Sequence, residues 1–69
     1  MSDDREGTVG PKSGLTADWY FDGQFVYLEH PQYQTAPCKL LPGKTPEGTA
    51  EWMLAELVTA MQLGTAKSR

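Results

Sequence analysis

Two side chains in this 69-residue chain could carry nucleophilic chemistry: its single histidine, His30, and its single cysteine, Cys38. They lie eight residues apart across a predicted turn, so a thiolate activated by an imidazole is one hypothesis. Such a site also needs a residue that orients the base and an oxyanion-binding loop, and no motif in the sequence supplies either. A minimal enzyme built on this pair is therefore the third-ranked hypothesis, and we predict that the protein is not an enzyme.

The other polar residues show no pattern typical of a cofactor or metal site. One histidine and one cysteine are too few for a zinc site. The segment Gly43-Lys44-Thr45 lacks the GxxxxGK spacing of a phosphate-binding loop and is typical of a turn that leads into a helix. The acids Asp18, Asp22 and Glu29 are scattered along a predicted hairpin. The sequence thus predicts no catalytic residue, no metal and no cofactor.

A β-hairpin is predicted between residues 17 and 29. Residues 17–21 and 24–29 are rich in aromatic and β-branched side chains, and Asp22-Gly23 between them favours a two-residue type I′ turn. This turn would pair Phe21 with Gln24 and Trp19 with Val26. Since side chains alternate between the two faces of a strand, one face is predicted to be core and the other to be exposed. The predicted core face carries Ala17, Trp19, Phe21, Val26 and Leu28, and the outer face carries Asp18, Tyr20, Phe25, Tyr27 and Glu29.

The remaining segments predict an edge strand and a helix. Pro37 restricts residues 35–41 to the edge of a sheet, because proline cannot donate to the hydrogen-bond ladder. Thr45 is a good N-cap, Pro46 suits the first helical position and Gly64 is a natural terminator. The apolar stripe of this helix consists of Ala50, Met53, Leu54, Leu57, Val58 and Met61. The predicted fold class is therefore α+β, a small ββ(β)α domain in which an antiparallel hairpin or three-stranded sheet is packed by one C-terminal helix.

Composition separates this predicted domain, residues 17–64, from two tails. Residues 1–16 are rich in glycine, serine and charge without apolar periodicity, and we predict that they are disordered. Residues 65–69 are predicted to be a frayed end. No apolar run approaches the roughly 20 residues of a membrane span, and the N-terminal residues do not have the pattern of a signal peptide. With a single cysteine, these features favour a cytoplasmic protein without a membrane partner.

The predicted domain is more acidic than the whole chain. The chain has nine acidic and six basic residues, for a net charge of −3. Between residues 16 and 63, six acids are opposed only by Lys39 and Lys44. Because nucleic-acid binding relies on clustered lysine and arginine, we expect no direct nucleic-acid partner.

Two apolar groups of side chains remain outside the predicted core. One is the outer face of the hairpin, and the other is a narrow stripe on the helix from Trp52 to Leu63. Exposed tyrosines also occur on sheets that bind nothing, because aromatic residues raise strand propensity, and Trp52 could pack on a neighbouring loop. Tyrosine and tryptophan nevertheless anchor protein interfaces more often than most residues. The predicted protein-binding residues are Asp18, Tyr20, Phe25, Tyr27, Glu29 and Trp52.

In size, acidic balance and hairpin-plus-helix plan, the chain resembles the small acidic proteins that bacteriophages encode to block host machinery, anti-CRISPR proteins among them. This resemblance implies an inhibitor that occupies a basic, nucleic-acid-binding surface on a larger protein or nucleoprotein complex. The alternative is a structural accessory subunit that docks in a larger assembly through the Trp52–Leu63 stripe. A homodimer is a further hypothesis, since so small a domain has a thin core that a second copy could stabilise.

Overall fold

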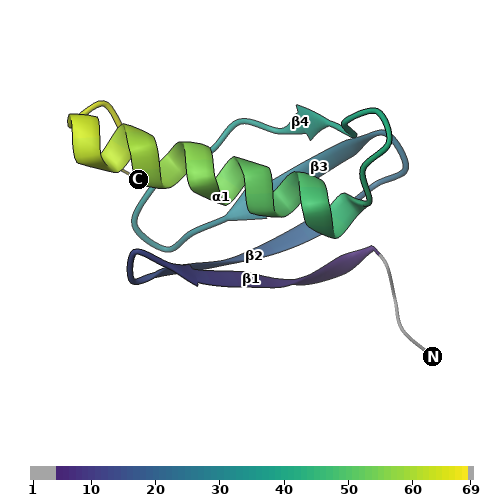
Figure 1. The fold of residues 1–69 in the computed structure, drawn as a ribbon, viewed down its shortest axis with the longest axis horizontal. Helices are drawn as coiled ribbons and strands as arrows, with labels where there is room; N and C mark the ends of the chain where they lie inside the picture. Colours follow the sequence, from purple (N-terminus) through teal and green to yellow (C-terminus); the bar gives the residue numbers. More distant parts are fainter. Residues whose placement is uncertain (1–4, 69) are drawn as a thin grey trace.

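The computed structural model describes residues 5–68, which form four strands and one helix in two layers (Figure 1). The strands are β1 (Glu6–Lys12), β2 (Leu15–Phe21), β3 (Phe25–Glu29) and β4 (Cys38–Lys39), and the helix is α1 (Pro46–Leu63). The sheet is antiparallel in the order β1-β2-β3-β4, and α1 covers one of its faces. The predicted α+β class is confirmed, with one strand more than the sequence predicted.

The additional strand, β1, comes from the segment that was predicted to be disordered. That prediction is wrong for residues 6–12, and residues 15–16 belong to β2; residues 1–4 lie outside the described residues. Val9 pairs with Ala17 and is the buried side chain of β1, with 4% of its surface exposed. A strand that buries one side chain has no apolar alternation for sequence reasoning to detect. Gly10 is required where β1 bends, because a Cβ there would lie 2.5 Å from the Leu15 carbonyl oxygen.

The hairpin of β2 and β3 has the predicted faces but a different register. Phe21 pairs with Val26 and Trp19 with Leu28, two residues further along β3 than predicted. Because side chains alternate with a period of two, a shift of two residues leaves every side chain on its original face. The predicted assignment of core and outer faces therefore survives the wrong register.

The register changes because the turn is built by a side chain. Gly23 takes a positive φ of 109°, but Asp22 does not take the second positive φ that a type I′ turn needs. Instead, the Asp22 carboxylate accepts hydrogen bonds from the backbone N–H groups of Gln24 and Phe25, each at 2.8 Å. Aspartate often closes a turn in this way, by bonding to the backbone two or three residues ahead.

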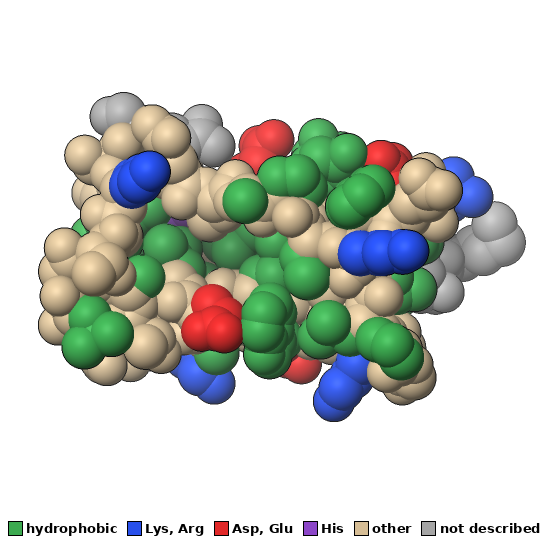
Figure 2. Space-filling view, turned by 90° about the horizontal axis from the view of Figure 1, so that it is seen from above, with side chains coloured by type: hydrophobic (Ala, Val, Ile, Leu, Met, Phe, Trp, Pro, Cys, Tyr) green, Lys and Arg blue, Asp and Glu red, His purple; other side chains and the backbone are tan. Residues whose placement is uncertain are grey.

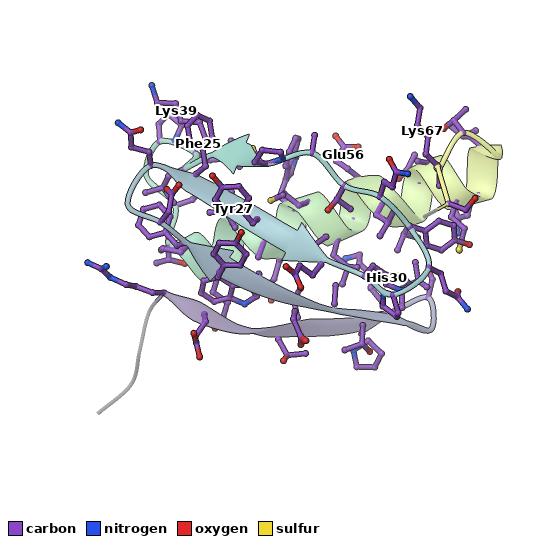
Figure 3. The ribbon with its side chains drawn as sticks, turned by 180° about the vertical axis from the view of Figure 1, so that it is seen from behind. Phe25, Tyr27, His30, Lys39, Glu56 and Lys67 are labelled. Atoms are coloured by element: carbon purple, nitrogen blue, oxygen red, sulfur yellow. The ribbon has the colours of Figure 1, made fainter. Side chains whose placement is uncertain are left out.

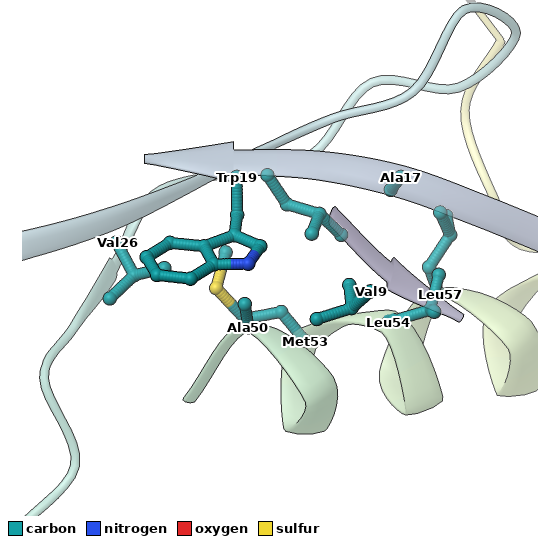
Figure 4. Packing of buried hydrophobic residues seen from close by; sticks show 9 residues of the cluster. Val9, Ala17, Trp19, Val26, Ala50, Met53, Leu54 and Leu57 are labelled. Atoms are coloured by element: carbon teal, nitrogen blue, oxygen red, sulfur yellow. The ribbon is translucent and has the colours of Figure 1, made fainter. Parts of the chain in front are cut away.

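The core fills the space between the sheet and α1 (Figure 4). Val26, Ala50 and Leu54 are almost completely buried, and the Trp19 indole lies between β2 and the helix. The helix has the predicted ends, since Thr45 Oγ1 accepts from the Gly48 N–H at 3.0 Å and the C-cap Gly64 is left-handed. The buried apolar residues are Val9, Ala17, Trp19, Val26, Leu28, Ala50, Met53, Leu54, Leu57 and Val58.

The segment after the helix is not frayed, so that prediction is wrong for residues 65–68; Arg69 lies outside the described residues. The backbone N–H of Gln34 donates to the Lys67 carbonyl at 2.8 Å, and Tyr33 and Ser68 form an isolated antiparallel bridge. Ala66 packs against the core. The link that follows β3 thus holds the end of the chain beside the helix.

Candidate functional site

The outer face of the sheet, turned away from α1, is built from three rows of side chains that run across the strands (Figure 3). Residues directly opposite each other in paired strands project to the same face, so the register defines each row. The rows are Glu6 with Tyr20 and Tyr27; Thr8 with Asp18 and Glu29; and Phe25 with Lys39.

Two tyrosines form the centre of the first row. The Tyr20 and Tyr27 rings are stacked, with centroids 4.6 Å apart and planes inclined by 11°. The Tyr27 hydroxyl donates a hydrogen bond to Asp22 Oδ2 at 2.9 Å, which fixes the direction of that ring. Tyr20 is 42% exposed and Phe25 is 37% exposed. The face therefore presents aromatic surface that is already ordered, so a partner would lose little side-chain entropy in contacting it.

Three hydrogen bonds favour the ionised form of Asp22. The bonds from the Phe25 and Gln24 N–H groups, and then the bond from the Tyr27 hydroxyl, lower the pKa of Asp22 below its ordinary value of 3.8. The bond to Asp22 raises the pKa of Tyr27 above its ordinary value of 10.0, because a phenolate would lose the bond and face a carboxylate. At a pH between the pKa values of Asp22 and Tyr27, the charged Asp22 carboxylate accepts a hydrogen bond from the neutral Tyr27 hydroxyl.

We predict a pH-dependent stability that the Asp22→Asn variant lacks. The folded-state pKa of Asp22 is lowered, so its contribution is present above 3.8 and is lost as the pH falls through the folded value. The folded-state pKa of Tyr27 is raised, so its contribution is present below 10.0 and is lost as the pH rises through the folded value. Melting curves should show a difference in Tm between wild type and variant that is constant near neutral pH and shrinks at both extremes. A difference that is the same at every pH would contradict this assignment.

Acidic side chains dominate the second row. Asp18 lies directly opposite Glu29 in the neighbouring strand, an arrangement of like charges that destabilises a sheet. Asp18 Oδ1 accepts a hydrogen bond from the Thr8 hydroxyl at 2.9 Å. Within the three rows, the one basic residue is Lys39, which stands in the row of Phe25. The face is therefore acidic beside its tyrosine pair.

Two shallow hollows adjoin Asp18. One of about 560 Å³ lies over β1 and β2 and is lined by Glu6, Thr8 and Tyr20 among others. The other, of about 320 Å³, is lined by Asp18, Glu29, His30 and Pro31. Each is large enough to accept a side chain from a partner surface, and each has carboxylates on its wall.

The structure brings together five of the six predicted protein-binding residues. Asp18, Tyr20, Phe25, Tyr27 and Glu29 share the outer face, as expected from their alternation. Sequence reasoning missed Glu6 and Thr8, which extend the same rows, because both belong to the strand that was predicted to be disordered. The polar residues at alternate positions 6 and 8 were the available signal, and Gly7 between them obscured it.

Trp52 lies elsewhere, on a groove between α1 and residues 34–39. The groove has a volume of about 700 Å³, and Trp52 and Ala60 are among its lining residues. Trp52 is 47% exposed. Leu63 is 72% exposed and does not line the groove, so the predicted stripe from Trp52 to Leu63 is only partly gathered into one surface.

His30 and Cys38 have separate hydrogen-bond partners. His30 is buried, its Nδ1 accepts from the Gln32 N–H at 3.1 Å, and its ring contacts Tyr33. Cys38 is a free thiol that donates to the Lys39 carbonyl at 3.3 Å. Among residues 5–68, no group of three histidine, cysteine, aspartate or glutamate side chains is placed to hold a metal ion.

Comparisons with protein-family models, with curated proteins and with solved structures found no match to this chain. Over the part of the chain that the structure describes, no helix has both the length and the apolar character to cross a membrane.

Proposed function

We propose that this protein is a small acidic protein-binding module that inhibits a nucleic-acid-handling complex, and that the outer face of its sheet binds a basic surface of that complex. The observation that carries the proposal is the placement of Asp18 directly opposite Glu29, beside the stacked tyrosines. In the free protein, this like-charge pair costs stability. A cationic side chain from a partner would relieve this repulsion, so binding would recover the stability that the pair costs in the free protein.

Arginine is the side chain that this face fits best. Its guanidinium group can bond two carboxylates at once, as Asp18 and Glu29 present them, and it also stacks on aromatic rings such as those of Tyr20 and Tyr27. Proteins that bind phosphate backbones expose clustered arginine and lysine. A partner surface of that kind would be blocked for nucleic acid while this protein occupies it, as the resemblance to phage-encoded inhibitors implies.

An interface of standard size would cover a modest share of this protein's surface. A typical specific interface takes about 800 Å² from each partner. The accessible surface of this protein is 4745 Å², so an interface of that size needs only about a sixth of it. The module acts by binding, in the cytoplasm, where a free thiol such as Cys38 stays reduced.

Substitution of the three aromatic residues tests this proposal. We expect the triple variant Tyr20→Ser, Phe25→Ser, Tyr27→Ser to lose the partner that wild type captures from a lysate of the source organism or its host. Far-ultraviolet circular dichroism should confirm that the variant folds, since the core is unchanged. The matched control is Trp52→Ser with Leu63→Ser, which should capture the partner normally. Capture that is unchanged in the triple variant would refute the assignment of this face.

A second candidate function is that of an accessory subunit docked permanently in a larger assembly. The exposure of Trp52 and Leu63 on α1 favours it. An interface of this kind is apolar and resists salt, so the control variant, and not the triple variant, would then lose the partner. Sedimentation of the isolated protein would detect self-association, which is expected if an obligate interface is left uncovered or if the protein forms a homodimer.

A further inference from the structure

The groove beside Trp52 lies between a helix and the edge of a sheet. Residues 34–39, which include β4, form one wall, and the residues of α1 from Trp52 to Ala60 form the other. Residues 65–67 line one end. Figure 2 looks down on this side of the molecule and shows hydrophobic side chains along its middle, with basic side chains toward both ends. The groove lies on the other side of the strands from the tyrosine pair of the outer face, and Lys39, at the edge of the sheet, borders both surfaces.

The wall formed by β4 has main-chain groups available to another strand. Within the described residues β4 is the last strand of the sheet and pairs only with β3. The Leu40 N–H donates to the Gln24 carbonyl at 3.1 Å, so the neighbouring residue, Lys39, turns its N–H and C=O away from β3. The hydrogen bond that the Lys39 carbonyl accepts within the described residues comes from the Cys38 thiol, a weak donor. Lys39 therefore offers a donor and an acceptor to a strand added at this edge.

The opposite wall sets the length and the character of that strand. From Trp52 to Ala60 the helix rises by about 12 Å, which equals roughly four residues of extended chain. Trp52, Met53 and Leu57 give this wall a mainly apolar surface, and the Trp52 ring is half exposed. A short extended segment with an apolar side chain directed at Trp52 would bury that ring, and buried tryptophans are frequent binding hot spots.

The charged side chains at the groove determine which residue types are expected on either side of the apolar stretch of the bound segment. Lys39 and Lys67 lie toward opposite ends of the groove, and Glu56 lies between them (Figure 3). Acidic residues on either side of an apolar stretch would meet the two lysines, and a basic segment would be repelled at both ends. The preferred charge is the reverse of that expected for the partner of the outer face.

We propose that this groove binds an extended, apolar peptide segment with acidic flanks, from a partner protein, by adding it as a strand beside β4. Addition of a strand to an exposed sheet edge obtains affinity from main-chain hydrogen bonds and specificity from alternate side chains. The segment is a second contact, independent of the outer face, and would let the protein engage a second partner in addition to the one that the outer face binds.

The test is selection from a library of random peptides displayed on phage, with the wild-type protein as bait. We expect enriched peptides with acidic flanks and apolar residues at every second position, and a synthetic consensus peptide should change the fluorescence of Trp52. Binding should weaken at least tenfold in Trp52→Ser and in Lys67→Glu, and also when a central residue of the peptide is replaced by proline. Binding should be unchanged in the variant Tyr20→Ser, Tyr27→Ser, which separates this site from the outer face.

Three outcomes would overturn the proposal. The first is the absence of any enriched sequence. The second is an apolar spacing of three and four residues, which would show that the groove takes a helix instead of a strand. The third is enrichment of basic peptides alone, all of which bind Trp52→Ser as well as wild type and lose binding in the tyrosine variant, which would place all binding on the outer face.

Discussion

Replacement of Trp19 by alanine is expected to leave most of the protein unfolded at room temperature, whereas the same replacement of Trp52 leaves it folded. Trp19 is 4% exposed and lies at the centre of the core, and Trp52 is 47% exposed. Removal of a buried tryptophan costs about 3–5 kcal/mol. A chain of this length has a total stability of about 3–10 kcal/mol, and the thin core of a small domain favours the lower part of that range.

The Trp19→Phe variant sharpens this prediction. The Trp19 Nε1 atom is buried and has no hydrogen-bond partner among residues 5–68. Such an unpaired donor itself costs about 1–3 kcal/mol. Phenylalanine keeps most of the buried area and removes the donor, so we expect a loss of less than about 1.5 kcal/mol.

Urea unfolding followed by circular dichroism measures the stability of all three variants. Trp52→Ala is expected to lie within about 1 kcal/mol of wild type and Trp19→Phe within about 1.5 kcal/mol, with Trp19→Ala far below both. Equal losses at the two tryptophans would mean that the core is not packed around Trp19 as described.

The second large effect is expected from reversing the two opposed charges of the outer face. The variant Asp18→Lys, Glu29→Lys should associate with the captured partner at least tenfold more slowly at low salt, because complementary charge accelerates encounter and like charge opposes it. The difference should shrink as salt screens the charges. Its fold should persist, since both positions are exposed and one like-charge pair replaces another.

A control variant distinguishes the effect of where these charges lie from the effect of the net charge of the protein. The variant Glu47→Lys, Glu51→Lys changes the net charge by the same amount, at two exposed positions on α1. We expect its association rate to change much less. Equal slowing of both variants would show that only the overall charge matters, and faster association of the reversed face would mean that the partner surface is acidic.

The sequence predicted those elements in which buried side chains recur at a regular spacing, which is every second residue in a strand and every third or fourth residue in the helix. The faces of β2 and β3 and the stripe of α1 follow from that periodicity, and the faces survived the wrong register because the shift was even. Strand β1 was missed because only Val9 of its side chains is buried. The turn was missed because the Asp22 carboxylate, and not a pair of positive φ angles, determines it.

The candidate site was predictable to a similar extent. Alternation placed five residues on one face, but the opposition of Asp18 and Glu29 depends on the true register, and the predicted register paired Asp18 with Tyr27. The groove beside Trp52 could not be predicted, because it depends on tertiary contacts of residues 34–39 and 65–68 with the helix. Local patterns carry no information about such contacts between distant segments.

The most direct test of the outer face as the binding surface is chemical-shift mapping of the isotope-labelled protein bound to its captured partner. We expect the largest changes at Asp18, Tyr20, Tyr27 and Glu29, with smaller changes at Glu6 and Thr8 in the same rows and little change at Trp52. Changes confined to α1 and residues 34–39, with the tyrosine signals unmoved, would contradict the proposal and assign binding to the groove.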